Sequence, residues 1–241
     1  MHRLVLLGTG TAVGKTHVAA TLAHALHSAH PAAPILPLKP IETGYPPTLD
    51  RPPPGSDAAT LEAAAANVRL PRPHPLFTHP EPLSPHLAAR RAATTLHLPT
   101  LTEWVAHAEH DATLHHPSPS PHGWTLVETP GGALSPLSPS ANNLAFAQAL
   151  EPATWILVAP DTLGVLHDLT ACLHAMRTTA RLPDHTVLTA ARPPDLSTGT
   201  NATELARLRI ATISTTFSPH DPSAPNQLAA AVLRHPPPFP L

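Results

Sequence analysis

The sequence predicts an α/β fold in which a mostly parallel sheet carries helices on both of its faces. Short β-type runs alternate with longer helical stretches, and this alternation favours parallel strands joined by helical crossovers. The runs are nearly continuous in Leu, Val and Ile, which is typical of strands covered by helices on both sides. The 241 residues suffice for one domain with a substantial core, so we expect a single domain over residues 1–241.

The expected elements follow in chain order from the apolar runs and the stretches between them. The predicted strands are residues 3–7, 35–38, 124–127, 154–159, 185–189 and 210–215. The predicted helices are residues 15–28, 57–66, 98–114, 142–150, 163–179, 201–208 and 226–233. Proline cannot donate a hydrogen bond within a ladder or a helix interior. We therefore predict loops at the proline clusters 46–54, 71–85 and 117–121. The cluster at 236–240 predicts a C-terminal tail over about residues 235–241.

Composition excludes several classes of protein. Charged residues make up only 12% of the chain, about half of the usual share, so charge-driven disorder is excluded. A net charge of -2 provides no cationic field for nucleic acid or an anionic membrane, and we expect neither partner. The apolar start at residues 4–7 is too short for a signal segment, and the single cysteine, Cys172, cannot form an intrachain disulfide. We therefore expect a cytoplasmic protein.

The glycine-rich segment GTGTAVGKT, residues 8–16, follows the first predicted strand and opens the first predicted helix. Its glycines let backbone N–H groups converge on an anion, the helix N-terminus adds partial positive charge, and Lys15 adds a full charge. Thr16 is expected to offer its hydroxyl to Mg²⁺. The usual spacing is G-x-x-x-x-G-K-[ST], but five residues separate Gly8 from Gly14 here. We interpret the segment as a variant P-loop rather than a turn that binds nothing, and the fold as P-loop NTPase-like.

Two carboxylates are candidate partners of a bound Mg²⁺, which prefers oxygen ligands. Glu128 follows the strand at 124–127, so it lies at the carboxyl edge of the sheet, where ligands bind in open α/β folds. Asp57 begins a predicted helix. The alternative for Glu128 is an ordinary acid at a strand end, and the alternative for Asp57 is an acid favoured by the helix dipole. With Thr16, these two residues form the predicted metal site.

Lysine usage singles out two positions. Of the 14 basic residues, only Lys15 and Lys39 are lysine. Lys39 follows the second predicted strand, so it reaches the same edge of the sheet as the P-loop. A lysine there can stabilise negative charge that develops on a transferring phosphoryl or acyl group. We predict that both lysines are catalytic, against the alternative that Lys39 is a solvated strand-end residue.

The many histidines do not predict a metal site. His107, His110, His115 and His116 are close in sequence, and the first two could share a helix face. No cysteine or suitably spaced acid completes a tetrahedral set with them. We therefore assign them no metal.

These residues together resemble the dethiobiotin synthetase family, whose ATP-dependent enzymes close the ureido ring in biotin synthesis. Five motifs of the family occur in order within about residues 3–180: GTxTxVGKT at 8–16, KP[VI]x[ST]G at 39–44, SD at 56–57, EPxSPH at 81–86 and VExxGGxxxPL at 127–137. Residues 162–164, Thr-Leu-Gly, also look like the family's turn before a helix whose N-terminus receives the substrate carboxylate across a homodimer interface.

The resemblance implies the reaction and the residues that carry it. The substrate would be 7,8-diaminononanoate, which forms a carbamate with CO2 or bicarbonate, and ATP would phosphorylate the carbamate before the second amine closes the ring. Lys39 would stabilise the carbamate and the phosphoryl group, while Thr43, Leu163 and Gly164 would contact the substrate. ATP as co-substrate and Mg²⁺ as cofactor would be held by Thr11, Ala12, Val13, Gly14, Lys15, Thr16, His17, Asp57, Glu128 and Gly131. The protein would be a homodimer.

The chain departs from the family pattern at several positions. The family commonly has an acid at the positions of Gly10 and Ala12 and an Asn at that of His167, and residues 190–192 lack the Asn expected to contact adenine. The alternatives are an ATP-dependent amide ligase related to the corrin amide ligases and acting on another amine, or a degenerate paralogue that binds nucleotide without turnover. A partitioning-type nucleotide switch would carry a further lysine early in the P-loop, where residues 9–13 have none.

Overall fold

The computed structural model describes residues 1–45, 51–65, 68–116, 123–190, 193–218 and 221–234. Its centre is a parallel sheet of six strands in the order β2-β5-β1-β6-β7-β8. The strands are β1 (His2–Gly8), β2 (Ile35–Leu38), β5 (Trp124–Glu128), β6 (Ala153–Asp161), β7 (His185–Ala190) and β8 (Thr215–Phe217). The predicted α/β architecture is confirmed.

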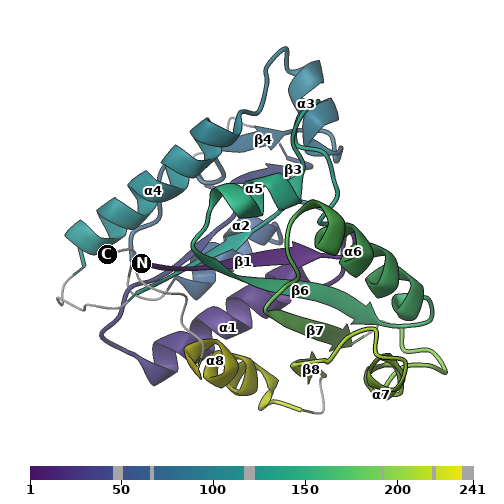
Figure 1. The fold of residues 1–241 in the computed structure, drawn as a ribbon. Coiled ribbons are helices and arrows are strands. Elements are labelled where there is room, and N and C mark those ends of the chain that lie inside the picture. The colour runs from purple at the N-terminus through teal and green to yellow at the C-terminus, as the bar shows by residue number, and fades with distance from the viewer. Residues whose placement is uncertain (46–50, 66–67, 117–122, 191–192, 219–220, 235–241) are drawn as a thin grey trace.

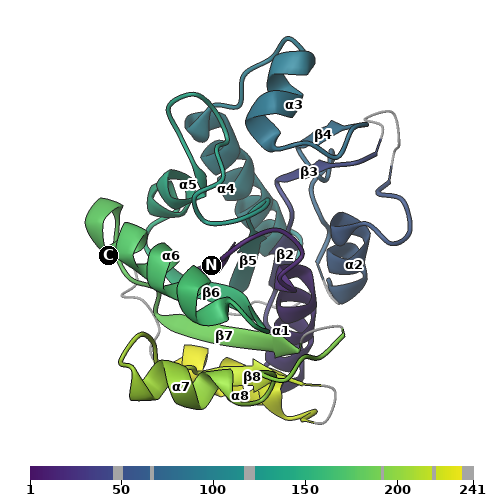
Figure 2. The ribbon, with the colours of Figure 1, turned by 90° about the vertical axis from the view of Figure 1, so that its right-hand side faces the viewer.

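Helices cover both faces of this sheet (Figures 1 and 2). One face packs against α1 (Lys15–Ala29), α2 (Asp57–Ala64) and α8 (Ala224–Arg234). The other face packs against α4 (Leu98–Leu114), α5 (Asn143–Ala149), α6 (Val165–Thr179) and α7 (Asn201–Arg207). In β1, Leu4 and Leu6 join the first core, whereas Val5 and Leu7 join the second. Successive side chains of a strand point to opposite faces, which explains why the strand is apolar throughout.

A second, smaller sheet lies beside the main one, and the prediction of a loop over residues 71–85 is wrong where this segment contains β4. β3 (Ile41–Thr43) pairs in parallel with β4 (Phe77–His79), and α3 (Pro85–Arg91) follows. Each strand has three residues, too few for a periodic pattern to be visible. Their pairing depends on a partner about 36 residues away in the register Ile41↔Phe77, which no local signal reveals.

The predicted strand at 210–215 is also wrong. The strand that ends the sheet is Thr215–Phe217, whose register begins with Val187↔Thr215. Ile210 and Ile213 are partly buried against the core formed with α4, α5 and α6. These apolar residues belong to the segment between α7 and β8 and pack against the core instead of pairing with β7.

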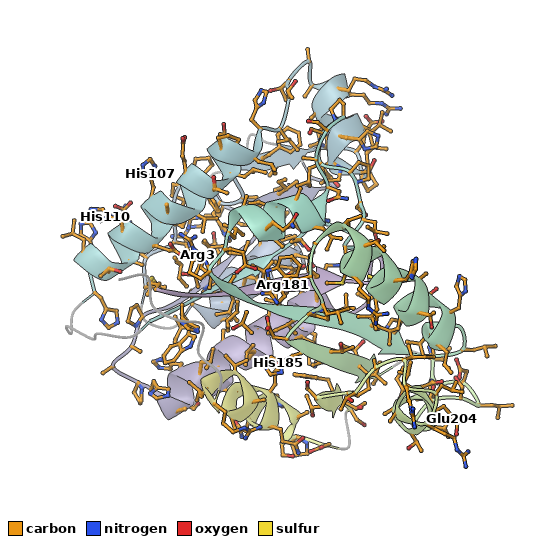
Figure 3. The ribbon with its side chains drawn as sticks, in the orientation of Figure 1. Arg3, His107, His110, Arg181, His185 and Glu204 are labelled. Atoms are coloured by element: carbon orange, nitrogen blue, oxygen red, sulfur yellow. The ribbon has the colours of Figure 1, made fainter. Side chains whose placement is uncertain are left out.

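The remaining expectations concern the C-terminal tail, the proline cluster at 117–121, a membrane span and the histidines of α4. The predicted tail at 235–241 and the proline cluster at 117–121 lie outside the described residues. Within the described ranges, no helix is both long enough and apolar enough to cross a membrane. His107 and His110 are exposed on the outer side of α4, and Arg3 at the start of β1 donates to Glu109 of that helix at 2.7 and 2.9 Å (Figure 3).

Candidate active site

The carboxyl ends of β1, β2 and β5 bring three sequence segments to one edge of the sheet. Leu6 of β1 lies opposite Glu128, the last residue of β5, and Leu38 of β2 lies opposite Val127. The segment after β1 is the P-loop, and the residue after β2 is Lys39. The register therefore places the P-loop, Lys39 and Glu128 side by side.

The P-loop presents its backbone as an anion cradle. Among the described residues, no hydrogen-bond acceptor is found for the backbone N–H groups of residues 10–14, although amide donors inside a protein normally have partners. Gly14, the N-cap of α1, has a φ of 90°, and a Cβ there would lie 2.8 Å from Thr189 Cγ2. Thr189 Oγ1 also donates to the carbonyl of Val13 at 2.8 Å. The loop conformation is thus fixed from β7, and its free donors suit phosphate oxygens.

Lys15 adds charge to this cradle. Its Nζ donates to the carbonyl of Gly10 at 3.0 Å, so the side chain folds back across the loop. Burial lowers the pKa of Lys15 to about 8, and the nearby Lys39 acts in the same direction, while Glu128 opposes them. A bound anion would favour the charged ammonium.

Lys39 lies at the centre of a buried ionic cluster. Its Nζ is 2.7 Å from Asp57 Oδ2 and 2.5 Å from Glu128 Oε1. The exposed fractions of the side chains are 4% for Lys39, 1% for Glu128 and 43% for Asp57. Burial alone would lower the pKa of Lys39, but the carboxylates of Glu128 and Asp57 outweigh it and raise that pKa above its ordinary value. Lys39 is therefore a fixed positive charge.

The same carboxylates converge on the P-loop threonine. Thr16 Oγ1 lies 2.7 Å from Asp57 Oδ1 and 3.0 Å from Glu128 Oε1. Glu128 Oε2 is buried and has no hydrogen-bond partner among the described residues. Hydroxyl and carboxylate oxygens are the ligands that Mg²⁺ prefers. The three predicted metal ligands therefore come together in a way that fits Mg²⁺.

Two residues that the sequence analysis missed hold this cluster in place. Glu42 accepts hydrogen bonds from the backbone N–H groups of Asp57 at 2.7 Å and Ala58 at 2.8 Å, at the start of α2. Asn143 donates to the carbonyl of Gly132 at 2.8 Å, in the loop after Glu128. Glu42 stands inside the KPIETG motif, which could have drawn attention to it. Asn143 carries no comparable local signal.

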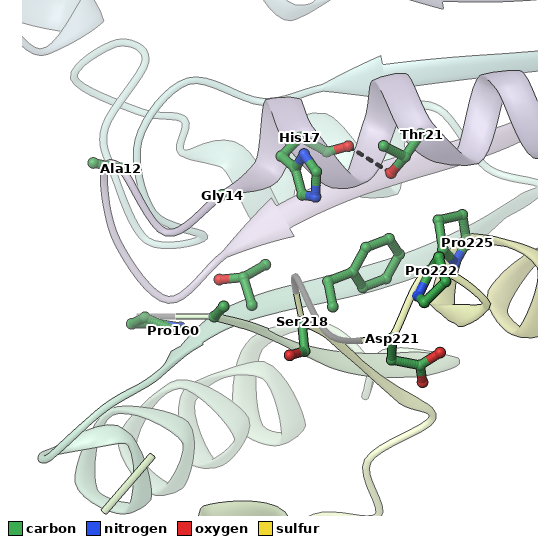
Figure 4. Close-up of a pocket in the computed structure, with 12 residues that line it drawn as sticks. Ala12, Gly14, His17, Thr21, Pro160, Ser218, Asp221, Pro222 and Pro225 are labelled. Carbon is green, nitrogen blue, oxygen red and sulfur yellow. Dashed lines mark hydrogen bonds between the residues drawn. The ribbon is translucent and has the colours of Figure 1, made fainter. Parts of the chain in front are cut away.

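A pocket of about 580 Å³ adjoins the P-loop on the side of β7 and β8. Figure 4 shows residues that line it, His17 among them. The ring of His17 meets that of Phe217 edge-on, with centroids 6.0 Å apart. The lining residues are Ala12, Gly14, His17, Thr21, Pro160, Thr189, Ala190, Phe217, Ser218, Asp221, Pro222 and Pro225. Ala12 enters it from a left-handed conformation with a φ of 57°. Residues 190–192 lack the Asn expected to contact adenine: Ala190 lines this pocket, and residues 191–192 lie outside the described part.

The remaining predicted site residues are dispersed. A Cβ on Gly131 would lie 3.7 Å from Thr11 Oγ1, so the P-loop touches the loop after β5. Thr43 Oγ1, on β3, donates to the carbonyl of Leu83 at 2.8 Å. Leu163 is 81% exposed, and Gly164 caps α6 with a φ of 101°. In the described structure no hydrogen bond or ion pair joins these last three residues to the Lys39 cluster.

Comparison with known proteins decides the family. A family model described as an AAA domain matches residues 2–210. The ATP-dependent dethiobiotin synthetase BioD of Methylobacterium nodulans is 31% identical over 238 residues, which cover 98% of this chain and 89% of that protein. The chain belongs to the dethiobiotin synthetase family.

Other comparisons agree with this assignment. The dethiobiotin synthetase of Caulobacter sp. strain K31 is 32% identical over 183 residues, covering 73% of this chain and 71% of the relative. Among solved structures, the MinC:MinD cell division protein complex of Aquifex aeolicus has a TM-score of 0.55 at 11% identity and covers 100% of this chain and 99% of that one. At such low identity the likeness shows the fold alone. As a dethiobiotin synthetase family member, the protein is an ATP-dependent ligase of biotin biosynthesis.

Proposed function

We propose that this dethiobiotin synthetase carboxylates 7,8-diaminononanoate with CO2 and closes the ring at the expense of ATP, with Mg²⁺ as cofactor. The observation that carries the proposal is the position of Lys39. Its ammonium lies between Asp57 and Glu128, and both carboxylates lie within 3.0 Å of the P-loop Thr16 hydroxyl. A charged group is thus fixed where a nucleotide γ-phosphate and an acceptor would meet.

ATP binds along the P-loop in this proposal. The free N–H groups of residues 10–14 and the ammonium of Lys15 hold the β and γ phosphates. Thr11, Ala12, Val13 and Gly131 shape the cradle, and the adjoining pocket takes the base beside His17. A volume of about 580 Å³ is in the usual range for small-molecule sites. The apolar and proline-rich lining suits the face of a planar base.

Thr16, Asp57 and Glu128 hold Mg²⁺ in the same proposal. Bound there, the ion would neutralise charge on the β and γ phosphates and orient them. Lys39 would then keep its contacts with the two carboxylates and direct its third N–H group to the reacting oxygens. Because its pKa is raised, Lys39 stays charged throughout.

The chemical steps then follow from positioning. One amine nitrogen of the substrate attacks CO2, loses a proton and becomes a carbamate. A carbamate oxygen attacks the γ-phosphorus, the bond to the bridging oxygen of ADP breaks, and a carbamic-phosphoric anhydride forms. The second amine attacks its carbonyl carbon, the bond from that carbon to the phosphate oxygen breaks, and the amine loses a proton to the released phosphate. Lys39 stabilises the negative charge on the carbamate and the transferring phosphoryl group, and the proximity of the second amine supplies the rest.

The substrate contacts imply two copies of the chain. Thr43 lies on β3 and can contact the substrate from the same copy as Lys39. Leu163 and Gly164 immediately precede α6, with Gly164 as its N-cap, and Leu163 is 81% exposed, so a partner can reach the turn at this helix start. We propose that each site binds the substrate carboxylate at the α6 N-terminus of the partner copy in a homodimer.

The test is direct. The purified protein is incubated with ATP, Mg²⁺, bicarbonate and 7,8-diaminononanoate, and dethiobiotin is measured by mass spectrometry. We expect product from the wild type, a loss of about 100-fold or more with Lys39→Ala, and ATP affinity close to that of the wild type in this variant. Tight ATP binding by the wild type without product would overturn the proposal.

A second candidate is an ATP-dependent ligase of another amine. It is favoured by Gly10 and Ala12, which leave the P-loop without the acids that the family commonly has there. Assaying diamines of different length, with Ala12→Glu as a restoring variant, separates the candidates. Product from a shorter diamine alone would favour the second one.

A further inference from the structure

His74 is a fully buried histidine outside the motifs that define the site. Its side chain has 0% exposure and lies between α2 and β4. The ring is parallel to that of Trp104 on α4, with centroids 6.1 Å apart and an interplanar angle of 3°. A buried imidazole needs hydrogen-bond partners for both nitrogens, and one of these partners is the backbone of Lys39.

The two ring nitrogens of His74 connect Lys39 to Glu62. The backbone N–H of Lys39 donates to Nε2 at 3.0 Å. Nδ1 lies 3.3 Å from Glu62 Oε1. Because Nε2 accepts, the proton of the neutral ring is on Nδ1, where it can be donated to the Glu62 carboxylate. The contacts thus select one tautomer.

The backbone N–H of Lys39 has no strand to pair with. β2 is an edge strand of the main sheet, its register with β5 ends at Leu38↔Val127, and the next residue is Pro40. Lys39 itself is only 3% exposed, so water is a poor substitute. Without His74 this N–H would be a buried donor with no acceptor, which proteins avoid.

Through His74, Lys39 is connected to α2 at a second point. Glu62 lies on α2, and the first residue of that helix is Asp57. Asp57 in turn accepts from Lys39 Nζ at 2.7 Å. His74 therefore holds the backbone of Lys39 on one side and, through Glu62, the helix that carries Asp57 on the other.

We propose that His74 is a positioning residue, which sets the Lys39 ammonium and Asp57 in the geometry that phosphoryl transfer requires. The proposal rests on the proposed function for its kinetic consequence, while the contact itself is independent of it. His74 touches neither nucleotide nor substrate and acts through the Lys39 backbone and α2. Its loss should therefore change turnover more than nucleotide affinity.

The test compares two substitutions that differ in one property. His74→Gln keeps a side-chain acceptor for the Lys39 N–H, whereas His74→Leu removes it. We expect kcat for dethiobiotin formation to fall about 10- to 100-fold in His74→Leu, a usual range for residues that orient functional groups. We expect ATP affinity to change less than about threefold and His74→Gln to recover most of kcat. His107→Leu, an exposed histidine on α4, is the matched control and should match the wild type.

Hydrogen exchange of the Lys39 amide supplies a readout that does not depend on activity. The amide should be protected in the wild type and in His74→Gln, and should exchange faster in His74→Leu. Equal protection in all three proteins would overturn the proposal, as would an unchanged kcat in His74→Leu. Loss of ATP affinity and thermal stability in parallel with kcat, without rescue by Gln, would reduce His74 to a structural residue. A wild type that makes no dethiobiotin would refute the proposed function, and the exchange result would still decide the contact.

Discussion

The two lysines of this chain occupy regions that are built in different ways. Lys15 belongs to residues 8–16, in which consecutive backbone N–H groups form the cradle, with distant support from Thr189 on β7 and from backbone hydrogen bonds to β6 and to the loop after β5. Lys39 belongs to a cluster that draws on β2, α2 and β5, with Glu42 and His74 holding its members from outside. The first region depends on backbone conformation, and the second depends on charges brought together by the fold.

This difference predicts different sensitivities. The P-loop should respond most to substitutions that change φ or crowd the backbone. The Lys39 cluster should respond most to the loss of a charge or of a residue that orients one.

The largest effect is expected from Lys39→Met. The substitution leaves Glu128, which is 1% exposed, and Asp57 without the ammonium that contacts both of them, although the charge of Lys15 still acts on the two carboxylates. Breaking a buried ion pair on one side destabilises by about 3–5 kcal/mol, and urea denaturation measures the change. Arg91→Met is the matched control, because its pair with Glu81 has side chains about half exposed. That variant should show no measurable change, and equal losses in the two variants would contradict the buried cluster.

Gly14→Ala tests the backbone region. Gly14 has a φ of 90° and Thr189 Cγ2 2.8 Å from the position of a new Cβ. The left-handed conformation and the overlap together should cost about 2–4 kcal/mol, measured by urea denaturation, and should abolish ATP binding. Gly55→Ala has a φ of 87° but open space around the new Cβ. It should cost about 1–2 kcal/mol and leave ATP binding intact. Similar binding losses in both would show that overlap with β7 is unimportant.

Glu42→Ala should have a smaller effect. It removes the acceptor of two N–H groups at the start of α2, so Asp57 is held less firmly. Losing a carboxylate cap at a helix start costs about 1–2 kcal/mol, and the concentration of Mg²⁺ needed for half-maximal activity should rise. Thermal unfolding and a Mg²⁺ titration measure the two effects. Glu42→Gln retains one acceptor oxygen and should fall between Ala and the wild type. A Gln variant as weak as Ala would mean that the charge, not the hydrogen bond, matters.

The smallest effect is the pH dependence of His74. Burial lowers the pKa of His74, although Glu62 opposes this and Arg72 acts with it. Below its ordinary pKa the unfolded chain binds a proton at this residue that the folded protein does not bind. Stability should therefore fall as pH drops through about 6.5, and His74→Gln should flatten this part of the curve. Urea denaturation at several pH values, with exposed His107→Gln as control, checks the sign. An unchanged curve in His74→Gln would contradict the pKa shift.

Contiguous motifs predicted which residues lie together at the carboxyl edge of the sheet. The P-loop, Lys39, Asp57 and Glu128 were all found from short patterns beside apolar runs, and the structure brings them together. The sequence could not show that Leu163 and Gly164 lie apart from that cluster within one copy of the chain. It also missed His74, which stands among prolines, because the importance of that residue depends on the edge of β2 and on α2, which are distant in the chain.

By itself, the sequence determined the parallel α/β sheet, the anion cradle and the charges available at its edge. These depend on local apolar runs, glycine conformation and residue type. Only the tertiary structure decided the small β3–β4 sheet, the shift of the last strand to Thr215–Phe217, and the contacts of Glu42 and His74. Those features arise from pairing between distant segments and from buried donors that need acceptors, and neither leaves a pattern in a short stretch of sequence.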